Sequence, residues 1–331
     1  MKLTIDGRAL CRSLTGIGNF TKNLVSSLSK YYEIYLSAHK KFFLPENFSG
    51  KIIVGPELYG SLWFHLFFPK LQRDDLLFCP LNIKPYKTKK KSIVVIHDLV
   101  PFLYPNWHKL KIRLSILPFL EDTIQSSCTI TISKKTRDEI YKYFKKKEIF
   151  VIPNGNNPYN GKINWEREEV PKEYFLYLGT IEPRKNVNFL MKFWEENKNL
   201  PPLLIAGGTG WKVKIKKIPK NIKILGYLKE EEKYYLLKNA LSLIYPASYE
   251  GFGLPVIEAA SEGVPVISTS VPAIEEYKIL SHIKIDLNFK SLKEALIKVM
   301  KGKLPREKSV MPSWDEVALK YKEVIDWYAK S

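Results

Sequence analysis

The 331-residue sequence is poor in several features that would place it in a class at once. Its three cysteines, Cys11, Cys79 and Cys128, are odd in number and lack metal-ligand spacing, which excludes a disulfide scaffold and suits a reducing cytosol. No run of about 18 uncharged apolar residues is present, so the sequence predicts no membrane-spanning helix. Its start, Lys2 to Asp6, is typical of a strand rather than of a signal peptide.

Acidic residues are the other shortage. The chain has 53 Lys and Arg against 34 Asp and Glu, a formal net charge of +19. Residues 1–165 have 26 basic and 12 acidic residues, net +14, and residues 166–331 have 27 and 22, net +5. This excess favours an acidic partner, such as a sugar nucleotide, nucleic acid or an anionic membrane. A generally lysine-rich proteome is the alternative explanation.

The hydrophobic pattern is that of an α/β protein. A hydrophobic content of 45% excludes a disordered chain, and the length favours two domains. Short apolar runs alternate with amphipathic stretches, as parallel sheets covered by helices require. The predicted strands are 2–6, 34–37, 76–80, 92–97, 129–133, 149–152, 174–179, 203–206, 222–225, 241–245 and 264–268. The predicted helices are 17–30, 61–71, 107–126, 134–147, 185–197, 230–239, 255–262 and 314–330.

A turn-rich segment divides the chain. The pattern breaks at Pro153-Asn154-Gly155, and about twenty polar residues follow. We therefore expect a domain at 1–155, a linker at 156–173, a second domain at 174–312 and a closing helix at 313–331. Both domains are predicted to be doubly wound. Ligands of such sheets bind at the carboxyl ends of the strands, which predicts a reaction site between two facing domains.

Two segments combine glycine or cations with the beginning of a helix. Gly16 and Gly18 open the first predicted helix, where free backbone amides favour an anion; a tight turn with helix capping is the alternative. Arg184 and Lys185 follow a buried strand. Because cations are unfavourable at a helix N-terminus, we expect an anion such as a diphosphate to compensate. Two exposed surface cations are the alternative here.

The segment from Tyr245 to Ala260 carries the most chemistry. A strand leads into a glycine loop, and Pro255 fits the first position of the next helix. Glu250 then lies in the loop and Glu258 in the first helical turn, above free amides from Gly251 to Gly253. Carboxylates accept pairs of sugar hydroxyls, so a polyol ligand would explain both. A simple capping role for Glu258 is the alternative.

The ordered set of motifs resembles the family 4 retaining glycosyltransferases of the GT-B fold. The resemblance covers most of the chain. The matching segments are Gly16-Ile-Gly18-Asn-Phe20, Val95-Ile-His97-Asp98-Leu99, Thr131-Ile-Ser133, Val151-Ile-Pro-Asn154-Gly155, Leu178-Gly-Thr-Ile-Glu-Pro-Arg184-Lys185-Asn186, Gly226-Tyr227 and Glu250-x7-Glu258. It implies two Rossmann-like domains facing a central cleft, with the closing helix crossing back to the N-terminal domain.

The resemblance also implies roles for individual residues. Arg184 and Lys185 would hold the diphosphate of the donor, Glu258 the ribose, and Glu250 the transferred sugar. His97 would orient the sugar or the acceptor; a hydrogen-bonded residue at the end of a strand is the alternative. The expected catalytic residues are His97, Arg184, Lys185 and Glu250. The expected donor-binding residues are Gly16, Gly18, Thr180, Arg184, Lys185, Tyr227, Glu250, Gly251, Phe252, Gly253, Leu254 and Glu258.

The expected reaction moves a hexose, with mannose as the first candidate, from a GDP- or UDP-linked donor to a hydroxyl of a glycan or lipid-linked acceptor. Neither a cofactor nor a metal is expected, because the chain has no Asp-x-Asp triplet. The cytoplasm is the expected location. The aromatic segment 58–68 and the cations Lys109, Lys111 and Arg113 favour docking on an anionic membrane. The alternative is that the aromatic side chains lie on a helix face that packs into the core. A nucleotide-sugar epimerase and a basic nucleic-acid-binding protein are the alternative functions.

Overall fold

The computed structural model describes residues 1–11, 14, 16–71, 76–161, 170–210, 213, 215 and 217–331. It divides into two compact units, which are described separately. The N-terminal unit comprises Met1–Gly155 and Pro312–Ser331, and the C-terminal unit comprises Asn156–Met311. Part of the predicted linker, residues 162–169, lies outside the described residues.

Seven strands of the N-terminal unit's described residues form one parallel sheet, in the order β3-β2-β1-β4-β5-β6-β7. The chain first moves from β1 to β3 on one side and then from β4 to β7 on the other, so the winding direction reverses between β1 and β4. The strands are β1 (Lys2–Asp6), β2 (Glu33–Ala38), β3 (Gly50–Val54), β4 (Leu76–Cys79), β5 (Ser92–Ile96), β6 (Cys128–Thr131) and β7 (Ile149–Val151).

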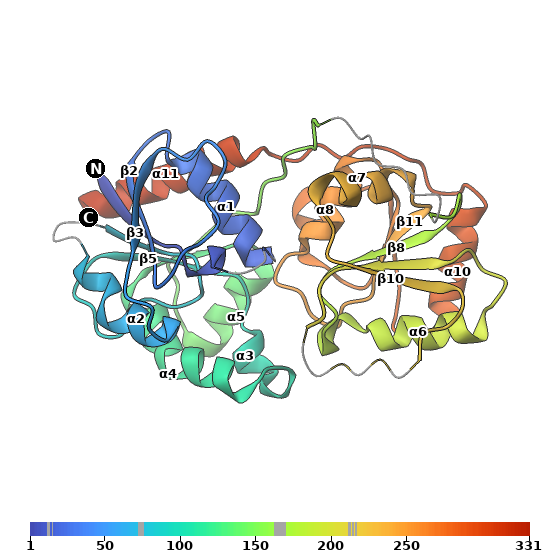
Figure 1. Ribbon diagram of the computed structural model, residues 1–331, viewed down its shortest axis with the longest axis horizontal. Helices are drawn as coiled ribbons and strands as arrows, with labels where there is room; N and C mark the ends of the chain where they lie inside the picture. The colour runs from blue at the N-terminus through green and yellow to red at the C-terminus, as the bar shows by residue number, and fades with distance from the viewer. Residues whose placement is uncertain are drawn as a thin grey trace. The chain divides into compact units, whose positions relative to one another are not determined.

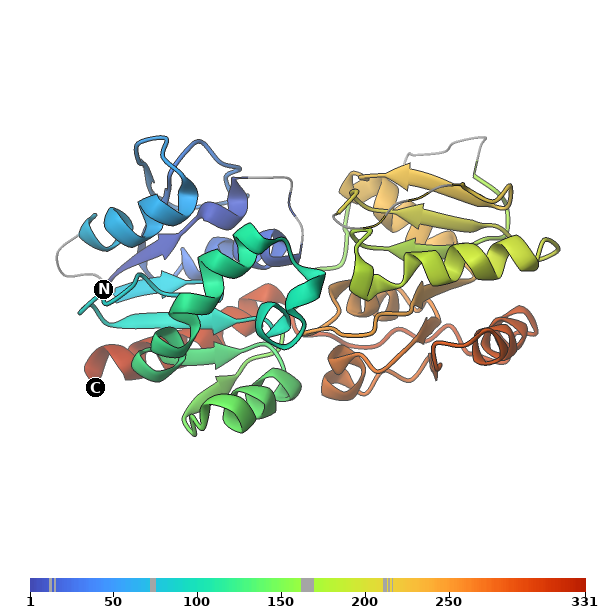
Figure 2. The same ribbon diagram turned by 90° about the horizontal axis from the view of Figure 1, so that it is seen from below.

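Helices cover both faces of this sheet, with α1 and α11 on one face and α2 and α4 on the other (Figures 1 and 2). The helices are α1 (Gly16–Leu28), α2 (Gly60–Leu66), α3 (Val100–Leu103), α4 (Leu110–Ser126), α5 (Lys134–Phe144) and α11 (Trp314–Lys330). Strand residues alternate between the two faces: Leu77 and Cys79 pack toward α2 and α4. Phe78 packs against Tyr321 of α11. The last helix of the chain is thus part of the N-terminal core.

The C-terminal unit repeats this architecture with six strands among its described residues, in the order β10-β9-β8-β11-β12-β13. Its winding direction reverses between β8 and β11. The strands are β8 (Phe175–Leu178), β9 (Leu203–Ala206), β10 (Ile222–Gly226), β11 (Ser242–Tyr245), β12 (Val266–Ser268) and β13 (His282–Lys284). The helices are α6 (Val187–Glu196), α7 (Glu230–Asn239), α8 (Leu254–Ser261), α9 (Pro272–Tyr277) and α10 (Phe289–Met300).

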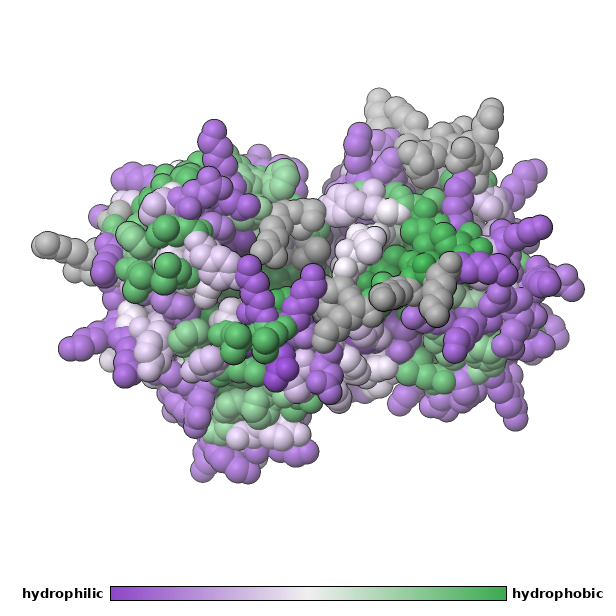
Figure 3. All heavy atoms as spheres, turned by 60° about the horizontal axis from the view of Figure 1, so that its bottom comes forward, coloured by the Kyte–Doolittle hydropathy of each residue, from purple (hydrophilic) through white to green (hydrophobic). Residues whose placement is uncertain are grey.

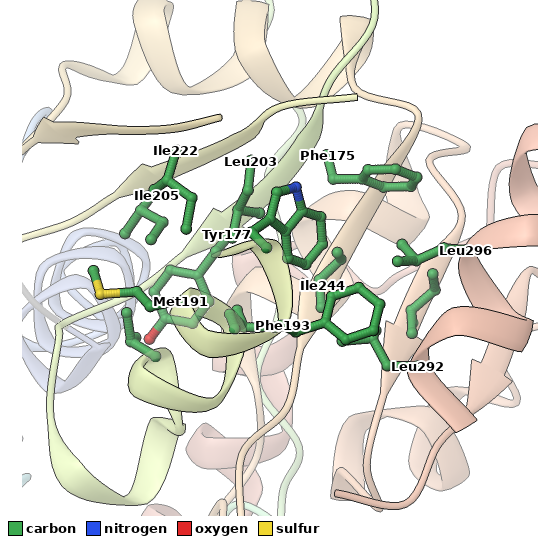
Figure 4. Packing of buried hydrophobic residues seen from close by; sticks show 14 of the residues in the cluster. Phe175, Tyr177, Met191, Phe193, Leu203, Ile205, Ile222, Ile244, Leu292 and Leu296 are labelled. Carbon is green, nitrogen blue, oxygen red and sulfur yellow. The ribbon is translucent and has the colours of Figure 1, made fainter. Parts of the chain in front are cut away.

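One face of this second sheet packs against α6 and α10. Figure 4 shows the aromatic rings of Phe175 and Phe193 among the aliphatic side chains of Ile244, Leu292 and Leu296 in this layer. These side chains are all fully buried. Such continuous burial explains why the strands are short apolar runs without alternation.

The predicted α/β class and the two Rossmann-like sheets are confirmed. Most predicted elements are present with shifts of one to three residues at their ends. The ranges predicted above do not include β3, β13, α3, α9 or α10. β3 is an edge strand with exposed side chains at Ile52 and Val54, so burial leaves little pattern there. For α10 a signal did exist: Asn288 caps it, and Leu292, Leu296 and Val299 share one buried face.

Candidate functional site

The strongest candidate site lies at the carboxyl edge of the C-terminal sheet, between β8 and β11. These adjacent strands pair in parallel, and their following loops leave the sheet at the same edge. The winding of the sheet reverses there, and such a reversal point is the usual ligand position in doubly wound sheets. The loop after β8 carries Arg184 and Lys185, and the loop after β11 carries Glu250.

Four charged side chains and one tyrosine converge at this point. Arg184 donates from Nη1 to Oε1 of Glu250 at 2.6 Å and from Nη2 to Glu182 at 2.8 Å. Lys185 donates to the same Oε1 and contacts the Tyr245 hydroxyl. The Tyr245 hydroxyl donates to Oε1 of Glu250 at 3.0 Å. Two carboxylates and two cations therefore form one network that joins the two loops.

This network is almost completely buried, and its charges decide the protonation of its members. Burial alone would raise the pKa of Glu250, but Arg184 and Lys185 outweigh it and hold that pKa below its usual value. Burial lowers the pKa of Lys185, while Glu250 acts in the opposite direction. Burial also raises the pKa of Tyr245 far above its usual value. Glu250 is therefore an ionised carboxylate and Tyr245 a neutral donor at neutral pH.

Hydrogen bonds of the Asn186 side chain fix the two loops to each other. Asn186 adopts a left-handed conformation between the 3₁₀ turn Pro183–Lys185 and α6, so the helix begins at Val187, two residues later than predicted. Its amide nitrogen donates to the Pro246 carbonyl at 2.8 Å and to the Ser248 hydroxyl at 2.7 Å. The cations thus belong to a turn that is fixed to the opposite loop, rather than to the first turn of a long helix.

The glycine loop leads directly into α8. Gly253 has a φ of 110°, and a Cβ there would lie 2.4 Å from Cγ1 of Val271, so this position requires glycine. Helix α8 begins at Leu254, which makes Pro255 its second residue rather than its first. Glu258 is consequently the fifth residue and lies in the second turn. The prediction that it lies in the first turn is wrong, because the left-handed glycine ends the loop one residue earlier.

Glu258 does not join the network around Glu250 but has a partner of its own. Oε1 of Glu258 lies 2.9 Å from Nζ of Lys233, which projects from α7. Lys233 also pairs with Glu230 at 2.9 Å. Burial acts to lower the pKa of Lys233, but Glu258 and then Glu230 outweigh burial and raise that pKa above its usual value.

The remaining predicted donor residues of the C-terminal unit lie at the same edge of the sheet. Thr180 is half-buried, and its carbonyl accepts a hydrogen bond from Tyr177 at 3.2 Å. Gly251 and Phe252 are buried, and the Phe252 ring meets Tyr277 edge-on at 5.9 Å. Tyr227 directly follows β10, two strands away from β8, with an exposed ring.

His97 belongs to the N-terminal unit, where it directly follows β5. Its Nε2 lies 2.8 Å from the Pro80 carbonyl, which can only accept, so Nε2 carries the proton. Its backbone N–H donates to Asn82, and its ring meets Phe20 edge-on at 4.7 Å. Burial lowers its pKa to about 4, although Pro80 and Asp98 oppose this shift. His97 is therefore neutral at pH 7, and its catalytic role stays a prediction.

Gly16 and Gly18 also lie in the N-terminal unit. Gly16 is the exposed first residue of α1, and Gly18, two residues further on, is buried. A Cβ on Gly18 would lie 3.3 Å from the Ala9 carbonyl and 3.1 Å from the Leu14 side chain. Close packing of α1 on the preceding turn is thus one reason for this glycine, and its contact with a donor stays a prediction.

Sequence reasoning assigned no role to three residues that complete these contacts: Glu182, Tyr245 and Lys233. Glu182 and Tyr245 lie within the quoted motifs, two and five residues from the groups they contact. Lys233 shares a helical turn with Glu230, but nothing in the sequence links it to Glu258. Within the described ranges, no group of three or more His, Cys, Asp or Glu side chains is placed to hold a metal ion.

Comparison with known proteins identifies a family for the C-terminal part of the chain. Residues 162–311 match the model of the glycosyl transferases group 1 family. The chain is 25% identical over 334 residues to O-antigen chain mannosyltransferase B of Escherichia coli, covering 83% of this chain and 84% of that protein. It is 28% identical over 200 residues to the O-antigen chain mannosyltransferase RfbU of Salmonella typhimurium, covering 56% of this chain and 54% of RfbU.

Solved structures show the same fold along the whole chain. Sucrose-phosphate synthase from Thermosynechococcus elongatus matches with a TM-score of 0.72 at 16% identity, and both chains are covered completely. WaaG, a glycosyltransferase involved in lipopolysaccharide biosynthesis, matches with a TM-score of 0.68 at 16% identity over 99% of this chain and 97% of WaaG. The C-terminal unit is therefore a group 1 glycosyltransferase domain of family 4, in a chain with the GT-B fold.

Proposed function

We propose that this protein is a retaining glycosyltransferase that transfers mannose from a nucleoside diphosphate sugar, with GDP-mannose as the first candidate, to a hydroxyl of a glycan or lipid-linked acceptor. The observation that carries the proposal is the network of Arg184, Lys185 and Glu250 at the reversal point of a group 1 glycosyltransferase domain. The two O-antigen mannosyltransferase relatives support the choice of sugar and acceptor.

The chemistry follows from where charge develops. Breaking the bond between sugar and phosphate leaves new negative charge on the diphosphate, and prepositioned cations stabilise the transition state most. Arg184 and Lys185 are held in place by Glu182 and Glu250 before any ligand arrives. An arriving diphosphate would share these cations with Glu250. Because two cations can do this work, we expect transfer to need no divalent metal and to survive EDTA.

Retention could use Glu250 as a nucleophile or a front-face attack assisted by the leaving phosphate. Oε1 of Glu250 accepts hydrogen bonds from Arg184, Lys185 and Tyr245. A carboxylate whose charge is compensated by two cations is a weak nucleophile, which supports the front-face route. A covalent glycosyl adduct on Glu250, trapped with a fluorinated donor and located by mass spectrometry, would contradict it.

The first test is nucleotide binding. Thermal unfolding is measured with GDP, UDP, ADP and dTDP, because a ligand at 100 times its Kd stabilises the folded protein by about 2.7 kcal/mol. Arg184→Ala and Glu258→Ala should both weaken the response to the preferred nucleotide. Arg137→Ala, which removes an exposed arginine of α5, is the matched control and should respond like the parent. No response to any of the four nucleotides would refute the proposal.

The second test separates transfer from isomerisation. GDP-mannose is incubated with the protein alone and then with an added glycan acceptor. A transferase gives a new glycoside only in the second case, and NMR of its anomeric proton reports retention or inversion. An isomerised sugar in the first case would favour the epimerase instead.

We also propose that the N-terminal unit docks on an anionic membrane through α2 and α4. Leu62 and Leu66 on α2 and Leu110 and Leu114 on α4 are exposed. Each pair is four residues apart, so its members share one helix face. The aromatic residues of segment 58–68 were expected to contribute, but the structure corrects this for Trp63, Phe64 and Phe68, which are fully buried core residues.

Cations flank these leucines. Lys109 and Lys111 are exposed, Arg113 is half-buried, and Nζ of Lys111 lies 4.2 Å from the ring centre of Tyr59, just before α2. Figure 3 shows apolar side chains among hydrophilic ones on the N-terminal unit in this view. Apolar side chains beside lysines suit the interface of an anionic bilayer. No helix in the described part of the chain is both long and apolar enough to span a bilayer.

Liposome flotation tests this docking. The parent should float with vesicles of phosphatidylcholine and phosphatidylglycerol and not with phosphatidylcholine alone. The triple change Lys109→Glu, Lys111→Glu and Arg113→Glu should abolish flotation. The matched control reverses three charges on α10, at Lys290, Lys293 and Lys298, and should still float. Equal flotation with both vesicle types would contradict the proposal.

A further inference from the structure

One cation near the candidate site has no part in the proposed reaction. Lys233 extends from α7 to α8 and is nearly buried, with 15% of its side chain exposed. Its Nζ lies 2.9 Å from Oε1 of Glu258 and 2.9 Å and 3.1 Å from the two carboxylate oxygens of Glu230. The ammonium group is therefore held between two carboxylates on different helices.

This arrangement fixes the Glu258 carboxylate from one side. A glutamate has three rotatable bonds, so ordering its side chain costs conformational entropy. Lys233 is itself restrained, because Glu230 holds its ammonium and the Tyr234 ring lies 4.9 Å away. Glu258 is thus already ordered by a salt bridge, with Oε1 as the oxygen that faces α7.

The charges around the candidate site give Lys233 a second effect. The network near β8 and β11 contains Glu182 and Glu250 against Arg184 and Lys185, so it is close to neutral. Glu258 and Glu230 would add two negative charges on the helices beside it. A nucleoside diphosphate is an anion and would be repelled by uncompensated carboxylates. Lys233 compensates one of these two charges.

We propose that Lys233 is a positioning residue for nucleotide recognition. It orients the Glu258 carboxylate and partly neutralises its charge, so that this carboxylate can accept hydrogen bonds from the ribose hydroxyls of a nucleoside diphosphate. The inference rests on the proposed function and deepens it. Lys233 acts through Glu258 and does not contact the phosphates.

The test uses calorimetric titration of six proteins. These are the parent, Lys233→Met, Lys233→Arg, Lys238→Met, Glu258→Gln and the double variant of Lys233→Met with Glu258→Gln. Each is titrated with the nucleoside diphosphate that stabilises the parent most and with its 2′,3′-dideoxy counterpart. Lys238 is the matched control, because it also extends from α7 toward α8 but pairs with Glu262, past the far end of α8, at 3.5 Å.

We expect Lys233→Met to weaken binding of the ribonucleotide about tenfold, the middle of the range for coupled side chains. Binding of the dideoxynucleotide should weaken far less, through the lost charge compensation alone, because this nucleotide lacks the hydroxyls that donate hydrogen bonds to Glu258. Lys233→Arg should restore most of the ribonucleotide affinity, and Lys238→Met should bind like the parent. In the double variant with Glu258→Gln, the loss should not add.

Each other outcome has a distinct meaning. Equal weakening for both nucleotides would show a direct contact with the phosphates and overturn the positioning role. Unchanged ribonucleotide binding in Lys233→Met would overturn the inference while leaving the proposed function intact. Failure of the parent to bind any nucleotide would refute the proposed function itself. Melting curves without ligand show whether Lys233→Met is folded, and Lys233→Arg provides the test if it is not.

Discussion

Both units place a carboxylate and an arginine two residues apart near the end of their first strand, Asp6 and Arg8 at the end of β1 and Glu182 and Arg184 in the loop after β8, and the two pairs are built differently. In the N-terminal unit Asp6 and Arg8 form a bidentate pair, with Nε to Oδ1 at 2.9 Å and Nη2 to Oδ2 at 2.8 Å. The Arg8 guanidinium also lies 3.6 Å above the Phe64 ring. In the C-terminal unit Arg184 forms salt bridges with both Glu182 and Glu250.

The difference lies in how many carboxylates each arginine joins. Arg8 pairs with the single carboxylate of Asp6, which is completely buried at the end of β1. Arg184 instead connects the loop after β8 to the loop after β11, across the reversal point of the sheet. A bidentate local pair mainly maintains the fold, whereas a cation shared between two carboxylates can exchange one of them for an anionic ligand. The same topology thus carries a structural pair in one unit and a candidate binding site in the other.

The largest expected effect comes from breaking the shared pair. In the proposed reaction Arg184 stabilises the leaving diphosphate, so we expect Arg184→Ala to lower kcat for sugar transfer about a thousandfold. Transfer from GDP-mannose to a glycan acceptor is the measurement. Arg184→Lys keeps the charge without the planar fork and should recover part of the rate. An unchanged rate in Arg184→Ala would show that the candidate site in the C-terminal unit is not where the reaction takes place.

Breaking the local pair should instead reduce stability. Arg8→Ala leaves the buried Asp6 carboxylate unpaired, which costs about 3–5 kcal/mol. Hydrogen exchange resolved by segment should show lost protection in the N-terminal unit and unchanged protection in the C-terminal unit. Replacing both partners, Asp6→Asn with Arg8→Met, should recover much of the loss. Equal destabilisation by single and double changes would show that the pair is not the cause.

Mild acid should also distinguish the two units. Burial lowers the pKa of His65 and His97 to about 4, below their unfolded value of about 6.5. Their contribution to stability is complete above pH 6.5 and is lost as the pH falls toward 4. The C-terminal unit has His282, whose pKa burial also lowers, and Glu250, whose lowered pKa preserves its contribution until the pH falls below the usual carboxyl range.

Hydrogen exchange between pH 7 and pH 4 measures this difference. We expect protection to fall first in the N-terminal unit. His65→Asn keeps an acceptor for the Tyr86 N–H, which donates to Nδ1 of His65 at 3.1 Å, and removes one titrating group. This variant should lose less stability across the same pH range than the parent. A steeper loss in the C-terminal unit would contradict the assignment.

Helix caps should show the smallest effect and no difference between the units. The Ser133 hydroxyl accepts from the Thr136 N–H at 3.2 Å at the beginning of α5, and the Asn288 side chain accepts from the Ser291 N–H at 2.9 Å at the beginning of α10. Ser133→Ala and Asn288→Ala should each cost about 1 kcal/mol. Urea unfolding measures both, and Ser133→Asp should retain the cap. Clearly unequal losses would mean that the units differ in more than their buried charges.

Much of the fold was predictable because buried parallel strands are short apolar runs, and runs such as Ile93 to Ile96 indicate them directly. The edge strand Gly50–Val54 has exposed side chains and was missed for that reason. The importance of Arg184, Lys185, Glu250 and Glu258 was also predicted from local motifs. Their roles in the proposed reaction stay predictions.

The partners of these residues were not predictable, since salt bridges across loops leave no local pattern. Glu250 lies 65 residues from Lys185, and Glu258 lies 25 residues from Lys233. The aromatic segment 58–68 shows the same limit. Its aromatic content suggested a docking surface, but which side chains face the core depends on the helix face that packs on the sheet. Trp63 and Phe64 lie on the packed face and are buried, whereas Leu62 and Leu66 are exposed.

By itself the amino-acid sequence determined two α/β units, the position of the glycine loop and the kinds of charged groups near it. Apolar periodicity and glycine conformation act over a few residues, so they can be recognised without a structure. Only the tertiary structure decided that Arg184 and Lys185 both pair with Glu250 and that Glu258 is held by Lys233. These contacts depend on which strand ends and helix faces become neighbours when the sheets assemble. Because the residues in contact are far apart in the sequence, no local sequence pattern reveals them.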